Sequence, residues 1–377
     1  MQITADCLFG EGHTKGFQFP LFQRLRVLLL IPHLGGGGAE QVTALLAKGL
    51  SRDKYDLHLG LVTATEAITN EAGVTIHTLG ASRVRKGAFR LLRLVRRVKP
   101  DVVLSGMAHL NFLVLLLRPF FPSGTRVLVR QNGTVSADLS FADLPRYTGL
   151  LYRLLYRHAD RVICQSQAMA RDMAGVLGIE EDLIAVLPNP VDLDGIRAAA
   201  SNPYEWTGPG PHLLAVGRLS REKGFDLLLE ALPAVRKRFP QAGLVIAGAG
   251  PEDAALKTEC RLLGLEAAVC FAGQMENPYV LFPGATLFVL SSRREGMPNA
   301  LLEALAGGLA IVALPSSGGV IELLRDRPGT WLAPQISAKA LAISMICALE
   351  ALRTKQLCVH SFSLLDTRSS EVPALRE

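Results

Sequence analysis

Short apolar runs alternate with amphipathic segments along most of the chain. The runs have the length of buried strands, and glycine, proline or polar residues bound them. In the first half, strands are predicted at 26–31, 57–62, 74–77, 101–104, 126–129, 161–164 and 184–187. In the second half, they are predicted at 212–216, 244–247, 269–274, 285–290 and 310–313. Strands that alternate with helices in this way predict an α/β fold built on parallel sheets.

A segment rich in proline, glycine and small residues interrupts the alternation at 199–211, AASNPYEWTGPGP. It predicts a linker between one domain at 25–198 and another at 212–352. A chain of 377 residues suits two domains of ordinary size. We therefore expect two Rossmann-like parallel-sheet domains facing a cleft, with the functional site in the cleft. An N-terminal extension at 1–24 and an atypical tail at 353–377 would flank them.

Composition excludes several classes of protein. The chain is 49% hydrophobic and 20% charged, which is typical of a globular protein. No apolar run reaches membrane-spanning length, and the early acids Asp6 and Glu11 disfavour a signal peptide. The six cysteines form no Cys-x-x-Cys pair, which disfavours a zinc cluster or a disulfide framework. We expect a cytoplasmic protein.

The net charge of +6 is confined to the first half of the chain. Residues 1–200 carry 23 Lys+Arg against 17 Asp+Glu, whereas residues 201–377 carry 17 of each. Eight basic residues and no acid lie between Arg83 and Lys99. One helical face there would carry Lys86, Arg90, Arg93 and Arg97. The simpler interpretation is a solvated surface helix, and the alternative is peripheral docking to anionic lipid on the inner face of the cell membrane. No recognition module indicates nucleic acid.

The segment SSRREGMPNALLEALAGG, residues 291–308, holds the strongest candidate chemistry. It follows the strand at 285–290, and a helix is predicted from Asn299, as its N-cap, to a stop at the two glycines 307 and 308. Glu295 and Glu303 bracket the helix start, where backbone amides and the helix dipole favour a phosphate. A sugar nucleotide is a diphosphate with hydroxyl clusters at both ends, so this pattern suits it. The alternative is an ordinary solvated loop glutamate and a helical glutamate placed by the dipole.

Two further loops follow predicted strands in the first half. Four glycines, 35–38, lie between a strand and a helix, which would let backbone amides approach a phosphate, although a tight turn without ligand remains the alternative. The Gly-x-Gly-x-x-Gly fingerprint is absent, which disfavours a dinucleotide dehydrogenase. His109 follows the strand at 101–104, on the edge where α/β proteins place their sites.

Two cations occupy the first loop of the second domain, Gly217-Arg-Leu-Ser-Arg-Glu-Lys-Gly224. Arg218 can form forked hydrogen bonds and Lys223 is a compact charge, so the pair suits a diphosphate. The alternative is that both serve surface solubility.

These motifs resemble one enzyme family over roughly residues 25–335. GRLSREKG at 217–224 and EGMPNALLE at 295–303 are similar to the second domain of retaining family 4 glycosyltransferases, which have the two-domain GT-B fold. The first-domain resemblance rests on GGGGAE at 35–40, the loop with His109, CQSQAMARDM at 164–173 and LPNPVD at 187–192.

The resemblance implies a role for each site residue. Arg218 and Lys223 would bind the donor diphosphate, Glu295 the hydroxyls of the transferred sugar, and Glu303 the ribose. The remaining donor-binding residues would be Gly37, Gly38, Gln274, Met297, Asn299 and Ala300. His109 would lie near the reacting sugar or acceptor, and it would form the catalytic set with Glu295, Arg218 and Lys223.

The implied reaction is a retaining transfer of a hexose or N-acetylhexosamine from a nucleotide sugar to a lipid-linked or cell-surface glycan. The donor would be a UDP-sugar, because EGMPNALLEA is most similar to family members that use UDP-sugars. The reaction would need no metal, and no Asp-x-Asp motif directly follows a predicted strand. The nucleotide sugar would be a substrate, and no cofactor is expected. The alternatives are a sugar-nucleotide 2-epimerase of the same fold and a truncated, non-catalytic nucleotide-sugar-binding protein. The non-catalytic alternative arises because family members usually end in helices that cross back onto the first domain. The tail at 353–377 lacks the amphipathic periodicity of such helices.

Overall fold

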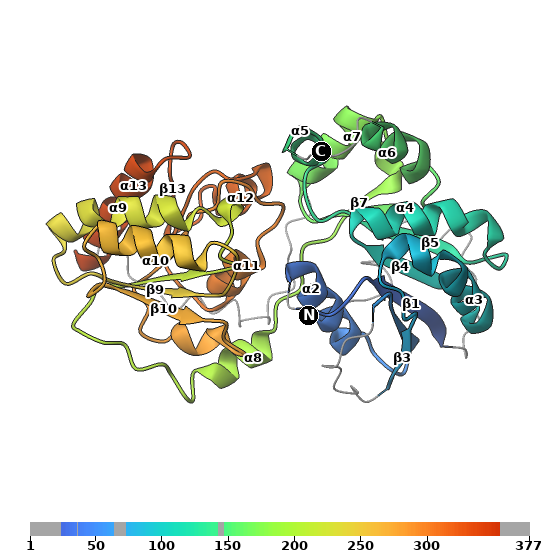
Figure 1. Cartoon of the computed structure of the whole chain (residues 1–377), viewed down its shortest axis with the longest axis horizontal. Helices are drawn as coiled ribbons and strands as arrows, with labels where there is room; N and C mark the ends of the chain where they lie inside the picture. The colour runs from blue at the N-terminus through green and yellow to red at the C-terminus, as the bar shows by residue number, and fades with distance from the viewer. Residues whose placement is uncertain (1–23, 36, 64–72, 142–146, 355–377) are drawn as a thin grey trace. The chain divides into compact units, whose positions relative to one another are not determined.

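The structure, a computed structural model, describes residues 24–35, 37–63, 73–141 and 147–354. The described residues form two compact units that divide between Pro190 and Val191, each with its own parallel sheet (Figure 1). The predicted α/β class with two Rossmann-like units is thus confirmed. The predicted N-terminal extension, apart from Arg24, and the predicted tail beyond residue 354 lie outside the described residues.

The first unit is built on a seven-stranded sheet with the order β3-β2-β1-β4-β5-β6-β7. Its strands are β1 (Leu25–Ile31), β2 (Tyr55–Leu61), β3 (Val74–Thr78), β4 (Val102–Gly106), β5 (Arg126–Arg130), β6 (Arg161–Cys164) and β7 (Ile184–Val186). All neighbouring strands in this sheet pair in parallel. Their carboxyl ends therefore lie along one edge of the sheet.

The central strand β1 shows why the apolar runs are continuous. Leu28 and Leu30 belong to one buried cluster, and Val27, Leu29 and Ile31 belong to another. Side chains alternate between the faces of a strand, so a strand that is covered on both faces needs apolar residues at every position.

Helices cover both faces of this sheet (Figure 1). Those that pack into the cluster with Leu28 are α3 (Ala88–Val98), α4 (Ala108–Leu117), α5 (Val135–Phe141), α6 (Thr148–Tyr156) and α7 (Gln167–Leu177). The opposite cluster receives α2 (Gly38–Gly49). The remaining elements are the 3-10 turns η1 (Val84–Gly87), η2 (Arg118–Phe120) and η3 (Glu181–Leu183).

The second unit has a six-stranded parallel sheet with the order β10-β9-β8-β11-β12-β13. Its strands are β8 (His212–Val216), β9 (Gly243–Ala247), β10 (Val269–Gly273), β11 (Leu287–Leu290), β12 (Ile311–Ala313) and β13 (Thr330–Leu332). Its helices and turns are α8 (Leu193–Ala199), η4 (Arg221–Lys223), α9 (Phe225–Arg238), α10 (Asp253–Leu262), η5 (Pro278–Leu281), α11 (Asn299–Ala306), α12 (Gly318–Leu324) and α13 (Ala338–Arg353).

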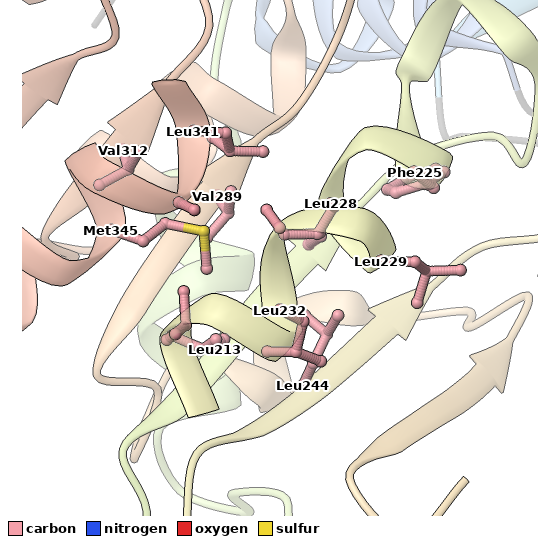
Figure 2. Close-up of a cluster of buried hydrophobic side chains, with 14 of the residues drawn as sticks. Leu213, Phe225, Leu228, Leu229, Leu232, Leu244, Val289, Val312, Leu341 and Met345 are labelled. Carbon is pink, nitrogen blue, oxygen red and sulfur yellow. The ribbon is translucent and has the colours of Figure 1, made fainter. Parts of the chain in front are cut away.

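One face of the second sheet is covered by α9, α10 and α13. Figure 2 shows Leu228 of α9 near Leu341 and Met345 of α13 and the strand residue Val289, and Leu232 near the strand residues Leu213 and Leu244. All of these side chains are buried. At about 25 cal/mol per Å² of apolar surface, such a cluster is a main source of the stability of the unit.

Three details differ from the sequence-based expectations. The units divide between Pro190 and Val191, so α8 and the segment predicted as a linker at 199–211 belong to the second unit. Ala199 is buried in the core of that unit, and the Tyr204 amide donates to the Val280 carbonyl at 2.8 Å.

The other two differences concern helix starts. Pro298, in an extended conformation, is the N-cap of α11, and Asn299 is the first helical residue rather than the cap. His109 lies within the first turn of α4, which begins at Ala108, and not in a loop as predicted.

Candidate functional site

In the second unit, the loop after β8 packs against the loop after β9 without room for side chains. Gly248 has a φ of +146°, and a Cβ there would lie 1.9 Å from the Gly217 backbone oxygen. Gly224 has a φ of +64°, and a Cβ there would lie 2.1 Å from the Ser291 backbone oxygen. Glycine is required at both positions, which fixes the path of the loop that carries Arg218 and Lys223.

The structure brings two predicted site residues, Lys223 and Glu295, into direct contact. Lys223 Nζ donates to Glu295 Oε1 at 2.7 Å, and the Ser292 hydroxyl donates to the same oxygen at 2.6 Å. The Glu295 side chain is only 9% exposed and that of Lys223 is 26% exposed. Ser291 Oγ also donates to the Lys223 carbonyl oxygen, which anchors the lysine backbone beside β11. A cation and a carboxylate are therefore held together at the carboxyl edge of the sheet.

Arg218 lies in the same loop and remains open to solvent. Its side chain is 69% exposed and its guanidinium lies 3.4 Å from Glu222 Oε1. Burial alone would raise the pKa of Glu222, but backbone and Ser220 hydrogen bonds and the charges of Arg218 and Lys223 lower it below 4.5. Glu222 is thus ionised at neutral pH and holds the arginine by a weak surface contact that an incoming anion can replace.

Sequence reasoning missed the residue that fixes the loop carrying Glu295. Arg293 forms a forked pair with Asp226 of α9, with both nitrogen–oxygen distances at 2.6 Å. Its amide donates to the Glu222 carbonyl oxygen at 2.8 Å. The loop after β11 and the start of α9, 67 residues apart in the sequence, are thereby joined. No local pattern predicts this pairing, although an arginine two residues before the candidate glutamate was a signal.

The second predicted carboxylate, Glu303, is buried within α11. It is 5% exposed and accepts a hydrogen bond from the Tyr279 hydroxyl at 3.2 Å. The start of α11 has no side-chain cap. Other predicted donor-binding residues lie at or near this edge: Gln274 directly after β10, Met297 in the loop after β11, and Asn299 and Ala300 as the first two residues of α11. Of these, Gln274 is exposed.

In the first unit, the glycine loop and His109 follow the adjacent strands β1 and β4. Gly37 is the N-cap of α2, Gly38 is its first residue, and Gly36 lies outside the described residues. His109 is exposed, and its pKa is lowered below 6.5 by partial burial of the ring and by nearby His33. The imidazole is therefore neutral at pH 7 and can accept or donate a hydrogen bond.

Glu40 is a buried acid that sequence reasoning did not single out. It is 6% exposed, and a Cβ at Gly37 would lie 2.4 Å from its Oε2. Its other oxygen is 3.5 Å from His33 Nδ1. The carboxylate thus folds back over the start of its own helix, which is favourable for the helix dipole.

Within the described residues, no group of three or more histidine, cysteine, aspartate or glutamate side chains could hold a metal ion. The Asp-x-Asp spacing at 192–194 follows no strand directly. Asp192 accepts from the Gly195 amide as the N-cap of α8, and Asp194 is paired with Arg197. In the described part of the chain, no helix is both long and apolar enough to cross a membrane.

Comparisons with known proteins agree with this architecture. Residues 197–356 match the family described as Glycosyl transferases group 1, and residues 36–194 match Glycosyltransferase Family 4. An uncharacterized glycosyltransferase of Methanocaldococcus jannaschii is 24% identical over 252 residues, covering 64% of this chain and 62% of that protein. An N-acetylgalactosamine-N,N'-diacetylbacillosaminyl-diphospho-undecaprenol 4-alpha-N-acetylgalactosaminyltransferase of Campylobacter jejuni is 28% identical over 311 residues, covering 79% and 83%.

Among solved structures, Anabaena HepE in complex with UDP and glucose superposes with a TM-score of 0.71 at 19% identity. The superposition covers 88% of this chain and 91% of that protein. At this identity the likeness establishes the fold, which is GT-B.

Proposed function

Because the chain belongs to the GT-B glycosyltransferases, with one half matching group 1 and the other family 4, we propose that it transfers a hexose or N-acetylhexosamine with retention from a UDP-sugar to a lipid-linked or cell-surface glycan. The observation that carries the proposal is the Lys223–Glu295 pair, joined at 2.7 Å beside the exposed Arg218. Cations for a diphosphate and a carboxylate for sugar hydroxyls meet there on one sheet edge.

The donor would displace existing contacts rather than fill an empty site. Arg218 is held only by an exposed pair with Glu222, which costs little to break. Lys223 would turn from Glu295 toward a phosphate oxygen, which frees the carboxylate to accept hydrogen bonds from the sugar. The uncapped start of α11 adds a dipole that favours the phosphates.

The proposed reaction conserves the configuration of the sugar. The bond between the anomeric carbon and the diphosphate oxygen breaks, and its electron pair leaves with the nucleoside diphosphate. The acceptor hydroxyl oxygen bonds to the anomeric carbon from the same face, and its proton passes to the leaving phosphate oxygen. Arg218 and Lys223 would stabilise the charge that grows on the leaving group. Neutral His109 would hydrogen-bond the reacting sugar or the acceptor.

The acceptor class is supported by the relative from Campylobacter jejuni, whose name describes a diphospho-undecaprenol substrate. We further propose that the basic helix α3 docks on anionic lipid headgroups. Its arginines Arg93 and Arg97 are exposed on the surface opposite the buried Leu91 and Val95. Phe89 is 68% exposed, with the Arg93 guanidinium 4.9 Å from its ring centre, and such a side chain can enter a bilayer interface.

A transfer assay tests this function. The full chain is incubated with UDP-hexoses or UDP-N-acetylhexosamines and a sugar linked to a lipid diphosphate, with and without EDTA. We expect UDP release and a product whose anomeric configuration by NMR matches the donor, in both conditions. An epimerised sugar nucleotide without transfer would instead indicate a 2-epimerase, and donor binding without turnover would indicate a non-catalytic binding protein.

A further inference from the structure

Arg130, the last residue of β5, is a buried cation without an acidic partner among the described residues. It is 6% exposed, and its guanidinium donates to the Asn189 side-chain oxygen. Burial lowers its pKa to about 10, so it stays charged at neutral pH. A charge buried without an opposite charge costs several kcal/mol, and natural proteins rarely keep one without a use.

Two acids of the first unit, Glu40 and Asp138, contact other groups. The Glu40 carboxylate folds over Gly37 and faces His33. Asp138 accepts a hydrogen bond from Gln131 Nε2 at 3.2 Å. The positive charge of Arg130 is therefore not balanced by either carboxylate.

Arg130 lines a recess at the carboxyl edge of the first sheet. Asn132 lines it from the segment after β5, Gly106 from the end of β4, and Ala39 and Thr43 from the first two turns of α2. A guanidinium, an amide and a helix start thus surround one space.

One polar atom without a partner lies after the strand next to Arg130. Gln165 Oε1, directly after β6, is buried and has no hydrogen-bond partner among the described residues. Ser105 Oγ in β4 is also unpartnered there, but it belongs to the opposite face of the sheet, in register with Val129. The other end of Gln165 is held, because its amide donates to the Gln131 carbonyl oxygen and, at 3.4 Å, to Asn132 Oδ1. Buried polar atoms normally have partners, so the unpartnered Gln165 oxygen, on a side chain that contacts Asn132, indicates a ligand-binding edge.

We propose that Arg130 and Asn132 bind a phosphate group of the acceptor. The inference rests on the proposed function, in which the acceptor is lipid-linked. An arginine fork matches phosphate oxygens, and a phosphate would supply the missing negative charge. The proposed donor cations, Arg218 and Lys223, lie in the second unit. The excess positive charge of the chain lies entirely in its first 200 residues, which favours a second anion site there.

The test uses inorganic pyrophosphate on the full chain in the presence of saturating UDP. Thermal melts and calorimetric titrations compare the wild type with Arg130→Met, Arg130→Lys and the control Arg126→Met. Arg126 belongs to the same strand but is exposed and paired with Asp160. We expect pyrophosphate to stabilise the wild type and the control, and its affinity to fall about tenfold or more in Arg130→Met. The ligand-free melting temperature of Arg130→Met should be equal or higher, because an unbalanced buried charge is gone.

Several outcomes would overturn the proposal. One is that pyrophosphate has no effect on the wild type. Another is that Arg130→Met melts lower but keeps full pyrophosphate binding, which would make Arg130 a structural tie to Asn189. Competition between UDP and pyrophosphate would assign the anion site to the donor. If Arg130→Met does not fold, Arg130→Lys decides, because unchanged affinity in that variant contradicts a forked contact. Failure of UDP-sugars to bind or react would refute the proposed function. The Arg130 test would still be interpretable in that case, because it measures pyrophosphate affinity and not sugar transfer.

Discussion

Replacing Lys223 by methionine removes the cation that faces the nearly buried carboxylate of Glu295. The two charged atoms are 2.7 Å apart, and the side chains are 26% and 9% exposed. Losing one partner of a fully buried ion pair costs about 3–5 kcal/mol. Ser292 still donates to Glu295 and water has some access. We therefore expect a smaller loss, about 2 kcal/mol in the free energy of unfolding.

A double-mutant cycle isolates the pair. Glu295→Gln leaves an ammonium that can reach water, so its expected cost is only about 1 kcal/mol. The double variant loses both charges, and the coupling energy should be about 1–2 kcal/mol. Urea unfolding followed by tryptophan fluorescence is a selective assay, because both tryptophans, Trp206 and Trp331, lie in the second unit. A coupling energy indistinguishable from zero would refute the claim that this contact holds the loop.

Three further predictions concern other parts of the molecule. Burial alone would raise the pKa of Asp226, but the hydrogen bonds and charge of Arg293 hold it below 3.8. The carboxyl group therefore binds protons less readily in the folded protein than in the unfolded chain. The stability it contributes is complete above about pH 4 and lost as the pH falls further, so Asp226→Asn should flatten the acid limb of the fluorescence-monitored stability curve. Gly248→Ala, which forces a Cβ onto the Gly217 carbonyl, should cost more than about 2 kcal/mol in the same urea assay, and an unaltered midpoint would count against the packing. Arg93→Glu should reduce sedimentation with anionic vesicles but not with neutral ones, and unchanged binding would argue against lipid docking by α3.

Much of the fold could be predicted from the sequence because strands covered on both faces need uninterrupted apolar residues. The segment Leu287–Leu290 is such a strand, and it was predicted within two residues. The helix α8 was not predicted. It has seven residues, and the burial of Ala199 against the core of the second unit depends on contacts distant in the sequence. Short elements of this kind carry too few periodic positions to be recognised.

The candidate site was predicted as a set of residues but not as a set of contacts. Lys223 and Glu295 were both selected, yet their pairing spans 72 residues and could not be predicted from spacing. Arg130, directly after the predicted strand at 126–129, was not selected as a site residue, because nothing in RVLVRQNG reveals that its side chain is buried. Burial arises from tertiary packing, and a charged residue after a strand is ordinarily exposed.

Calorimetric titration of UDP-sugars into the wild type, Arg218→Ala and Arg238→Ala tests the central claim most directly. Arg238 is a matched control because, like Arg218, it is exposed and paired with a glutamate, here Glu350. It is the last residue of the 14-residue helix α9, whose first residue lies beside the proposed site. We predict binding that weakens by about 10- to 100-fold in Arg218→Ala, the worth of a charge-assisted hydrogen bond, and is unchanged in Arg238→Ala. Equal affinities in all three proteins would contradict a donor site at the loop after β8.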